Sequence, residues 1–387
     1  MNLVEWIEII LKPKPKLTPV PVKLKPLMKK LTLILLFCLS FSTFAQNAAA
    51  YKTKAEAFFE KGEFEKAIAN LTLALKLNPK DDKALAKRAL CYEMIDKLDL
   101  ALNDNLELLK YDKSGAVYGS IGYNYLWLRK YDDARSYLKQ AIALLPDQVS
   151  YRYNLALSYQ FQKNYEQAII LYDEALKVSP DHKRSKVSKA RCLIFSNQIE
   201  KATALIDTFF AAQNFDVEML VLRADLKKED NKLSDAFQDY GRALAVLPED
   251  FEILNKYLKC LHALNFHEEE IDVRKREIDL MIKLKIDSLD IANSYALLAI
   301  AYEESDYLDA ALLNYDESIK LDPLGGEVGG IYYLRSILKA KLKDFDGACI
   351  DLDKAKELNP GNEEDLDQFF IDDEAYADFV EYCMPGL

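Results

Sequence analysis

The sequence predicts an all-α fold, an α-solenoid of about nine stacked helix pairs, and three observations support this. First, alanines recur about every 34 residues, at Ala67, Ala101, Ala134, Ala168, Ala202 and Ala236. Second, small residues, large apolar residues and prolines recur at fixed distances from these alanines, with the same spacing. Third, the chain has only 12 glycines and 12 prolines among 387 residues, too few for long disordered segments. A repeat of this length is one supersecondary unit that buries its apolar face only by stacking.

The companion residues define fixed slots around each alanine, which we call the rung of its repeat. Twelve residues before the rung stands a small residue: Ala55, Ala89, Gly122, Ala156, Ala190 and Ala224. Three residues before it stands a large apolar one: Phe64, Leu98, Tyr131, Tyr165, Ile199 and Leu233. Twelve residues after it, four repeats place Pro79, Pro146, Pro180 and Pro248. Small residues let two helices approach closely, and proline ends the second helix because it lacks an N–H donor.

The fourth repeat carries the pattern most completely, with Leu155-Ala156-x2-Tyr159 followed by Tyr165-x2-Ala168, Tyr172, Ala175 and Pro180. In these residues the chain resembles the tetratricopeptide repeat family. The resemblance implies helix-turn-helix repeats in a right-handed superhelix, whose first helices line a concave groove that holds a peptide or protein segment.

The later repeats depart from the pattern, and we place the whole array at residues 48–361, irregular at 251–291. The seventh rung falls on Glu270 and the eighth on Ala311, which is seven positions later than the period predicts. Seven residues are about two helical turns, so a lengthened second helix would keep its buried face in phase. Met281, Leu284 and Ile286 fit that extension. The ninth repeat has its rung at Ala348 and follows a glycine-rich loop at residues 325–330.

The two ends of the chain differ in composition from the array. Residues 362–387 contain no Lys or Arg and place Phe369, Phe370, Phe379 and Val380 at helical spacing, so we expect an acidic capping helix. Residues 1–27 alternate Lys and Pro without a core-forming pattern, and we expect an unstructured or non-native extension before a true start at Met28. Residues 28–45 read as a secretory signal peptide: two lysines, an apolar run of about 15 residues, and Ala45 before the cleavage site.

That signal predicts an exported protein that is periplasmic, associated with the cell envelope, or secreted, and it leaves a cleaved signal or a retained anchor as alternatives. The formal net charge of −12 predicts no nucleic-acid partner, because binding phosphates requires clustered Lys and Arg. We therefore expect a protein or peptide partner, and a membrane association only through the signal segment before cleavage.

The sequence predicts no enzyme, no cofactor and no metal site. Cys260, His262 and His267 lie close together, but Cys260 shares a packing slot with Cys91 and Cys192, His267 occupies the apolar turn slot, and a fourth ligand is not evident. No nucleophile and base stand out with a recognisable context. An unrecognised enzyme site near residues 258–291 is the weakest alternative.

Candidate partner-binding residues come from the first helices of the third to fifth repeats, where a second stripe is offset from the packing stripe. They are Tyr123, Leu126, Trp127, Tyr153, Leu157, Gln160, Phe161, Arg191 and Phe195. Aromatic residues and Arg are typical of interaction hot spots. Two alternatives stay open: the rings pack against the next repeat, or the protein is a structural subunit that oligomerises through its convex face or ends.

Overall fold

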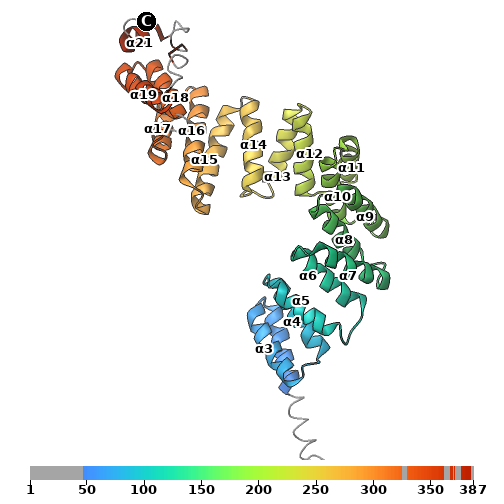
Figure 1. Ribbon diagram of the computed structural model, residues 1–387. Coiled ribbons are helices and arrows are strands. Elements are labelled where there is room, and N and C mark those ends of the chain that lie inside the picture. Colours follow the sequence, from blue (N-terminus) through green and yellow to red (C-terminus); the bar gives the residue numbers. More distant parts are fainter. Residues whose placement is uncertain (1–46, 325–328, 361–366, 369, 371–375, 385–387) are drawn as a thin grey trace, which may run out of the picture. The chain divides into compact units, whose positions relative to one another are not determined.

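The computed structural model describes residues 47–324, 329–360, 367–368, 370 and 376–384 (Figure 1). The predicted extension at 1–27 and signal peptide at 28–45 lie outside these residues, as do most of the glycine-rich loop and part of the acidic C-terminal segment. The chain divides into two compact units, residues 1–185 and 186–387. All regular structure in the described residues is helical, and most helices adjacent in sequence within a unit pack against each other. The predicted all-α fold of helix pairs is confirmed.

The first unit begins with a helix over residues 47–60 and continues with pairs joined by short turns. Its labelled helices are α3 (Phe64–Leu77), α4 (Asp82–Met94), α5 (Leu98–Leu108), α6 (Gly115–Trp127), α7 (Tyr131–Leu144), α8 (Val149–Phe161) and α9 (Tyr165–Val178).

The division between the units falls inside α10 (Lys183–Phe195). The second unit then holds α11 (Ile199–Ala211), α12 (Val217–Glu229), α13 (Leu233–Leu244), α14 (Phe251–Ala263), α15 (His267–Leu284), α16 (Ser288–Glu304), α17 (Leu308–Leu321), α18 (Gly330–Lys341), α19 (Phe345–Leu358) and α21 (Ala377–Cys383).

The rung alanines are fully buried. All six in the regular series, and also Ala311 and Ala348, have no exposed surface. The small residue of the first helix is buried as well, and a methyl group added to Gly122 would come within 2.6 Å of Leu138 Cγ. The small side chains at these positions therefore let the two helices of a repeat pack closely, as their size predicts.

A left-handed residue marks the turn inside each repeat. It stands five residues before every rung: Gly62, Asp96, Arg129, Lys163, Asn197, Asn231, Asn265, Asp306 and Lys343, with φ between 56° and 73°. In the fourth repeat the next N–H, that of Asn164, donates to the Tyr159 carbonyl at 2.9 Å. In the seventh, Phe266 N–H donates to the Leu261 carbonyl at the same distance. This C-terminal motif satisfies carbonyls at the helix end and fixes the same register in regular and irregular repeats.

The seven extra residues of the seventh repeat lengthen two helices. α15 has 18 residues and α16 has 17, whereas α9 has 14 and α8 has 13. The predicted long second helix is confirmed, but the following first helix shares the insertion. Met281 is buried as expected, and Ile286 packs against the same cluster. Leu284 was wrongly assigned to the buried face: it is 53% exposed, because α15 ends there and Lys285 turns left-handed.

Three repeats carry the same buried ion pair between their two helices, with the same sequence separation in each. Arg88 pairs with Asp104, Arg223 with Asp239 and Arg335 with Asp351. Each guanidinium donates two hydrogen bonds of 2.6–2.7 Å to both carboxylate oxygens. This two-pronged geometry is the strongest form of such a pair.

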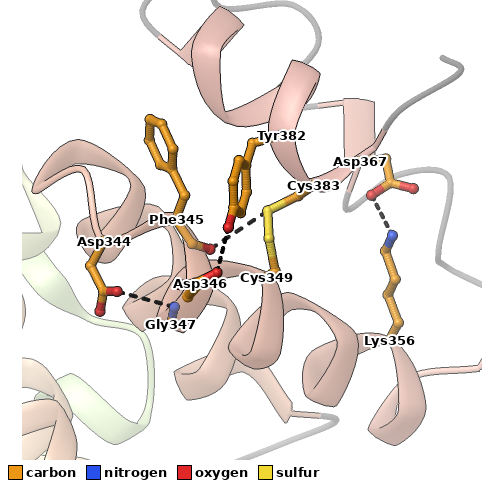
Figure 2. Close-up of a disulfide and its surroundings, with 9 residues drawn as sticks. All are labelled: Asp344, Phe345, Asp346, Gly347, Cys349, Lys356, Asp367, Tyr382 and Cys383. Carbon is orange, nitrogen blue, oxygen red and sulfur yellow. Dashed lines mark hydrogen bonds and ion pairs between the residues drawn. A yellow bond between two sulfur atoms is a disulfide. The ribbon is translucent and has the colours of Figure 1, made fainter.

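The C-terminal segment covers the last repeat. Phe370 and Phe379 are fully buried against Ala348 and Leu352 of α19. Cys383 of α21 forms a disulfide with Cys349 of α19, with the two Cα atoms 5.6 Å apart, and Tyr382 donates a hydrogen bond to Asp346 beside it (Figure 2). The sequence pattern did not indicate this bond, whereas Cys91, Cys192 and Cys260 are buried thiols, as their shared packing slot predicts.

Candidate functional site

An aromatic surface lies in the first unit, where the first helices of the third and fourth repeats end. Trp127 at the end of α6 and Phe161 at the end of α8 are 46% and 42% exposed, with ring centroids 5.9 Å apart. Tyr123 stands edge-on to Trp127 at 6.1 Å, and Tyr131 at the start of α7 lies 6.2 Å from Phe161. We call these four residues the aromatic surface. Rings that stack on one another while keeping one side in water can receive an apolar side chain without rearrangement.

Tyr153, a further candidate, is more enclosed. Its ring centroid lies 5.8 Å from that of Tyr172 and 5.4 Å from that of His182. Burial lowers the pKa of His182, with a further contribution from nearby Arg184. Tyr153 is therefore half-buried and supports the packing between α8 and its neighbours.

Three candidates are buried, which corrects the expectation that the whole second stripe is open. Leu126 has no exposed surface, and Leu157 and Gln160 are 7% and 9% exposed. Gln160 accepts a hydrogen bond from the Tyr172 hydroxyl at 2.6 Å. The reason is that a first helix inside a stack meets several neighbours, since α8 packs against α6, α7 and α9. Only the part of the stripe near the helix end reaches solvent.

A groove of about 830 Å³ opens in the second unit between α10, α12 and α14. All three are first helices of successive repeats. Arg191 and Phe195, the last two candidates, both line it, and Phe195 is 60% exposed. Apolar side chains form much of the wall: Ile194, Phe195, Val217, Val221, Leu222, Leu226, Leu247 and Ile253. We call this the α10–α12–α14 groove.

The polar lining of the groove is predominantly acidic. Six carboxylates face three cations, namely Asp216, Glu218, Asp225, Glu229, Asp250 and Glu252 against Arg191, Lys228 and Lys256.

Several of these groups already have partners. Arg191 pairs with Glu218, and Lys256 pairs with Asp225 at 2.9 Å. Asp216 and Asp250 accept hydrogen bonds from backbone N–H groups of α12 and α14 as N-caps. The groove therefore keeps an excess of negative charge that the neighbouring cations do not neutralise.

Sequence reasoning missed the acidic half of this groove. It followed the aromatic residues as far as the fifth repeat, because the first helix of the sixth repeat carries acidic residues at the equivalent positions. Asp225 stands one period after Arg191, and Glu229 stands one period after Phe195. Extending the stripe by the period alone would have found both.

The seventh repeat contains a buried charged network in place of the alanine rung. Glu270 has no exposed surface, and its Oε1 accepts hydrogen bonds from Arg274 at 3.1 and 3.2 Å. Arg274 also donates to Glu277 at 3.1 Å. Glu270 Oε2 lies 3.3 Å from His262 Nδ1 and 3.7 Å from His267 Nδ1. The charged cluster thus occupies the rung position that a buried alanine occupies in the other repeats.

Among the described residues, no helix has both the length and the apolar composition to cross a membrane.

Comparison with known proteins identifies the repeats. Family models described as tetratricopeptide repeat match residues 52–114, 113–181 and 162–226. The chain is 20% identical to human DnaJ homolog subfamily C member 7 over 334 residues, 81% of this chain and 60% of that protein. It is 48% identical to Protein PHOX3 of Arabidopsis thaliana over 62 residues, 16% of this chain and 8% of that protein. It thus spans less than two thirds of the length of either relative.

Among solved structures, PilW, a type IV pilus biogenesis factor, aligns with 52% of this chain and 94% of its own at 18% identity, with a TM-score of 0.47. The family models, the consecutive helix pairs and the period of the rungs agree. Residues 52–226 of this chain are tetratricopeptide repeats, a family that is typically non-catalytic and binds other proteins or peptides.

Proposed function

We propose that this protein is an exported, non-catalytic scaffold whose α10–α12–α14 groove binds a partner segment carrying basic and apolar side chains. The observation that carries the proposal is the combination of an apolar wall with six carboxylates in one groove. Repeats of this family act as protein-interaction scaffolds, and the charge of the groove narrows the class of partner.

Electrostatics supports a basic partner segment. An acidic groove with low-dielectric walls concentrates the field of its carboxylates and attracts a cationic ligand. Glu229 at the end of α12 is exposed, and no described cation lies within ion-pair distance of it. Lysine or arginine side chains of a partner would pair with such carboxylates, while Phe195 and Val221 take an adjacent apolar side chain. An acidic partner would meet repulsion along the same wall.

The aromatic surface of the first unit is the second proposed contact. Tyr123, Trp127 and Phe161 present ring area to solvent, and exposed clusters of this kind are unusual without a partner. Tyr153 would contribute only through its exposed edge. We propose that this surface holds an apolar stretch of the same partner or of a second one.

Export is proposed from the apolar segment at residues 28–45 and receives support from the C-terminal disulfide. Disulfides persist in oxidising compartments such as the bacterial periplasm and are rare in the cytosol. The bond between Cys349 and Cys383 fits an exported protein. We propose that this protein works in a cell-envelope assembly. Expression from Met28, followed by N-terminal sequencing of the exported form, should give a mature chain starting at Gln46. A chain that keeps residues 28–45 and stays in the cytosol would contradict this.

Peptide binding tests the groove directly. Fluorescent peptides in which lysine alternates with leucine are titrated against the full chain, and a glutamate–leucine series of equal length serves as the charge control. We expect anisotropy to report binding of the first series only. Phe195→Ala should weaken that binding roughly tenfold, since hot-spot aromatics contribute more than about 1 kcal/mol.

A charge-reversed pair sharpens the test. Glu229→Lys removes a groove carboxylate and should weaken the lysine series several-fold. Glu166→Lys makes the same change on exposed α9, outside the groove, and should have no effect. Equal binding of both peptide series, or equal loss in both variants, would reject the acidic groove as the selective element. In the same assay, Trp127→Ala combined with Phe161→Ala reports whether the aromatic surface takes part.

A further inference from the structure

The seventh repeat brings together three side chains with the chemistry of a divalent-metal site. His262 comes from the end of α14, His267 is the first residue of α15, and Glu270 lies in the first turn of α15. Each offers one ligand atom, and the three atoms lie within 4.8 Å of one another. The sequence placed the two histidines near each other but paired them with Cys260. In the folded chain, the carboxylate of Glu270 and not the thiol of Cys260 lies beside the two histidines.

Two of the distances already suit a bound cation. Glu270 Oε2 lies 3.3 Å from His262 Nδ1 and 3.7 Å from His267 Nδ1. A tetrahedral zinc ion with bonds of about 2.0–2.1 Å keeps its ligand atoms about 3.3–3.4 Å apart. Only side-chain adjustments of a few tenths of an ångström separate these two pairs from that geometry.

His267 gives an independent indication. Its Nδ1 is buried and has no hydrogen-bond partner among the described residues. A buried polar atom without a partner costs free energy, so this nitrogen calls for an explanation. Glu270 Oε2 already has a hydrogen-bond partner in His262 Nδ1 at 3.3 Å, so a metal ion bound to this carboxylate would supply the partner that His267 Nδ1 lacks.

Arg274 prepares the carboxylate for this role. It donates two hydrogen bonds to Oε1 of Glu270, which fixes the orientation of the group and leaves Oε2 facing the imidazoles. Hydrogen bonds of this kind behind a metal ligand are typical of metal sites. Arg274 in turn is held by Glu277.

Cys260 does not compete for the ion. Its thiol is fully buried in the hydrophobic core of the second unit, and burial raises its pKa, which disfavours the thiolate that metals bind.

We propose that His262, His267 and Glu270 bind one divalent cation of the zinc class, with water as the fourth ligand. The side chain of His262 is 52% exposed, so the site is open to solvent on one side and accessible to the ion. The cation clamps the end of α14 to the start of α15, at the point where the repeat lacks an alanine rung.

Zinc titration of the full chain tests this proposal. The protein is treated with EDTA, exchanged into metal-free buffer, and titrated with zinc chloride by calorimetry. We expect one zinc ion per chain and a higher melting temperature in its presence, since a ligand that binds only the folded state stabilises it. His262→Gln and His267→Gln should each weaken binding at least tenfold. His182→Gln removes the remaining histidine, in the first unit, and should leave affinity unchanged.

Cobalt substitution distinguishes this site from scattered surface binding. Co²⁺ at His262, His267 and Glu270 should give visible absorption bands typical of four-coordinate cobalt, and His262→Gln should abolish them. Because His262 is half exposed, that variant keeps the fold. Absence of stoichiometric zinc binding overturns the proposal, as does zinc affinity that is equal in the native chain and in both variants. The peptide titrations of the groove do not depend on either result.

Discussion

The fourth and seventh repeats solve the same packing problem with opposite chemistry. In the fourth, Ala156 and Ala168 have no exposed surface, and the two helices cross over methyl groups. In the seventh, the equivalent slots hold Leu258 and Glu270, both buried, and Arg274 neutralises the carboxylate. The turn geometry is the same in both repeats. The comparison teaches that turn and apolar stripes set the register, whereas the rung itself tolerates either close packing or a fully paired charge.

The largest expected effect comes from breaking the charged rung. Arg274→Met strands Glu270 and Glu277 as buried charges and should lower the free energy of unfolding by about 3–5 kcal/mol. Urea denaturation combined with hydrogen exchange in α15 measures the loss. Lys275→Met, at a neighbouring position whose side chain is 50% exposed, should cost less than about 0.5 kcal/mol. A loss in R274M no larger than in this control would mean that the network carries no stability.

Replacing the charged network of the seventh repeat with apolar side chains tests what the network contributes to stability. Glu270→Ala with Arg274→Leu and Glu277→Leu removes all three charges together and should be neutral or stabilising, because replacing a complete buried ion network by apolar side chains often is. The comparison of this triple variant with R274M separates the cost of an unpaired charge from the value of the network. A triple variant as unstable as R274M would show that the network also specifies the helix crossing.

The sixth repeat lies between the two designs, with an alanine rung at Ala236 and a buried ion pair three residues later at Asp239. Burial alone would raise the pKa of Asp239, but hydrogen bonds and attraction from Arg223 and Lys227 hold it below its usual value. The folded pKa is therefore below the unfolded one. This stabilisation is complete above about pH 4 and is lost as the pH falls through the lowered folded value.

Asp239→Asn tests that dependence on pH. At neutral pH it should cost about 1.5–3 kcal/mol, the range for hydrogen bonds to charged groups. The difference from the native chain should shrink as the pH falls below about 4, because the unfolded chain then takes up a proton at Asp239, whereas the folded chain does so only at a lower pH. Urea midpoints measured from pH 7 to pH 2.5 provide the readout. A difference that stays constant over this range would contradict a lowered pKa in the folded state.

Overpacking probes the alanine design of the fourth repeat. Ala156→Leu forces a branched side chain into a closed helix crossing and should cost roughly 1–3 kcal/mol. Ala143→Leu makes the same change at an exposed position of α7 in the same unit and should leave the melting temperature nearly unchanged. Equal melting temperatures for the two variants would show that the crossing at Ala156 is loosely packed.

The smallest effect concerns the shared turn. Lys163 in the fourth repeat has φ 60° and Asn265 in the seventh has φ 58°. Asn tolerates this left-handed conformation better than Lys, whereas glycine adopts it without steric cost. Lys163→Gly should therefore stabilise by roughly 0.5–1 kcal/mol, and Asn265→Gly by less. Thermal melts of the two variants compare them, and a destabilised K163G would indicate that the lysine side chain contributes packing of its own.

Much of the fold follows from the spacing of a few residue types. Rung alanines, small partners and closing prolines recur at one period, and each expresses a local requirement that size or a missing N–H imposes. The candidate site was only half accessible to the same reasoning. Trp127, Phe161 and Phe195 reach solvent, but Leu126 and Gln160 do not, because burial of a first helix depends on three neighbours rather than on its own stripe.

The sequence by itself determined the helix pairs, their register through nine rungs and the departure at Glu270, because these depend on residues within one repeat of each other. Only the tertiary structure decided which carboxylates share a groove, that Cys383 meets Cys349, and that Glu270 stands between two histidines and Arg274. Those meetings depend on how side chains from different helices orient across a packed interface. The sequence pattern specifies which face of each helix is apolar, but it does not specify how far apart side chains on two different helices lie.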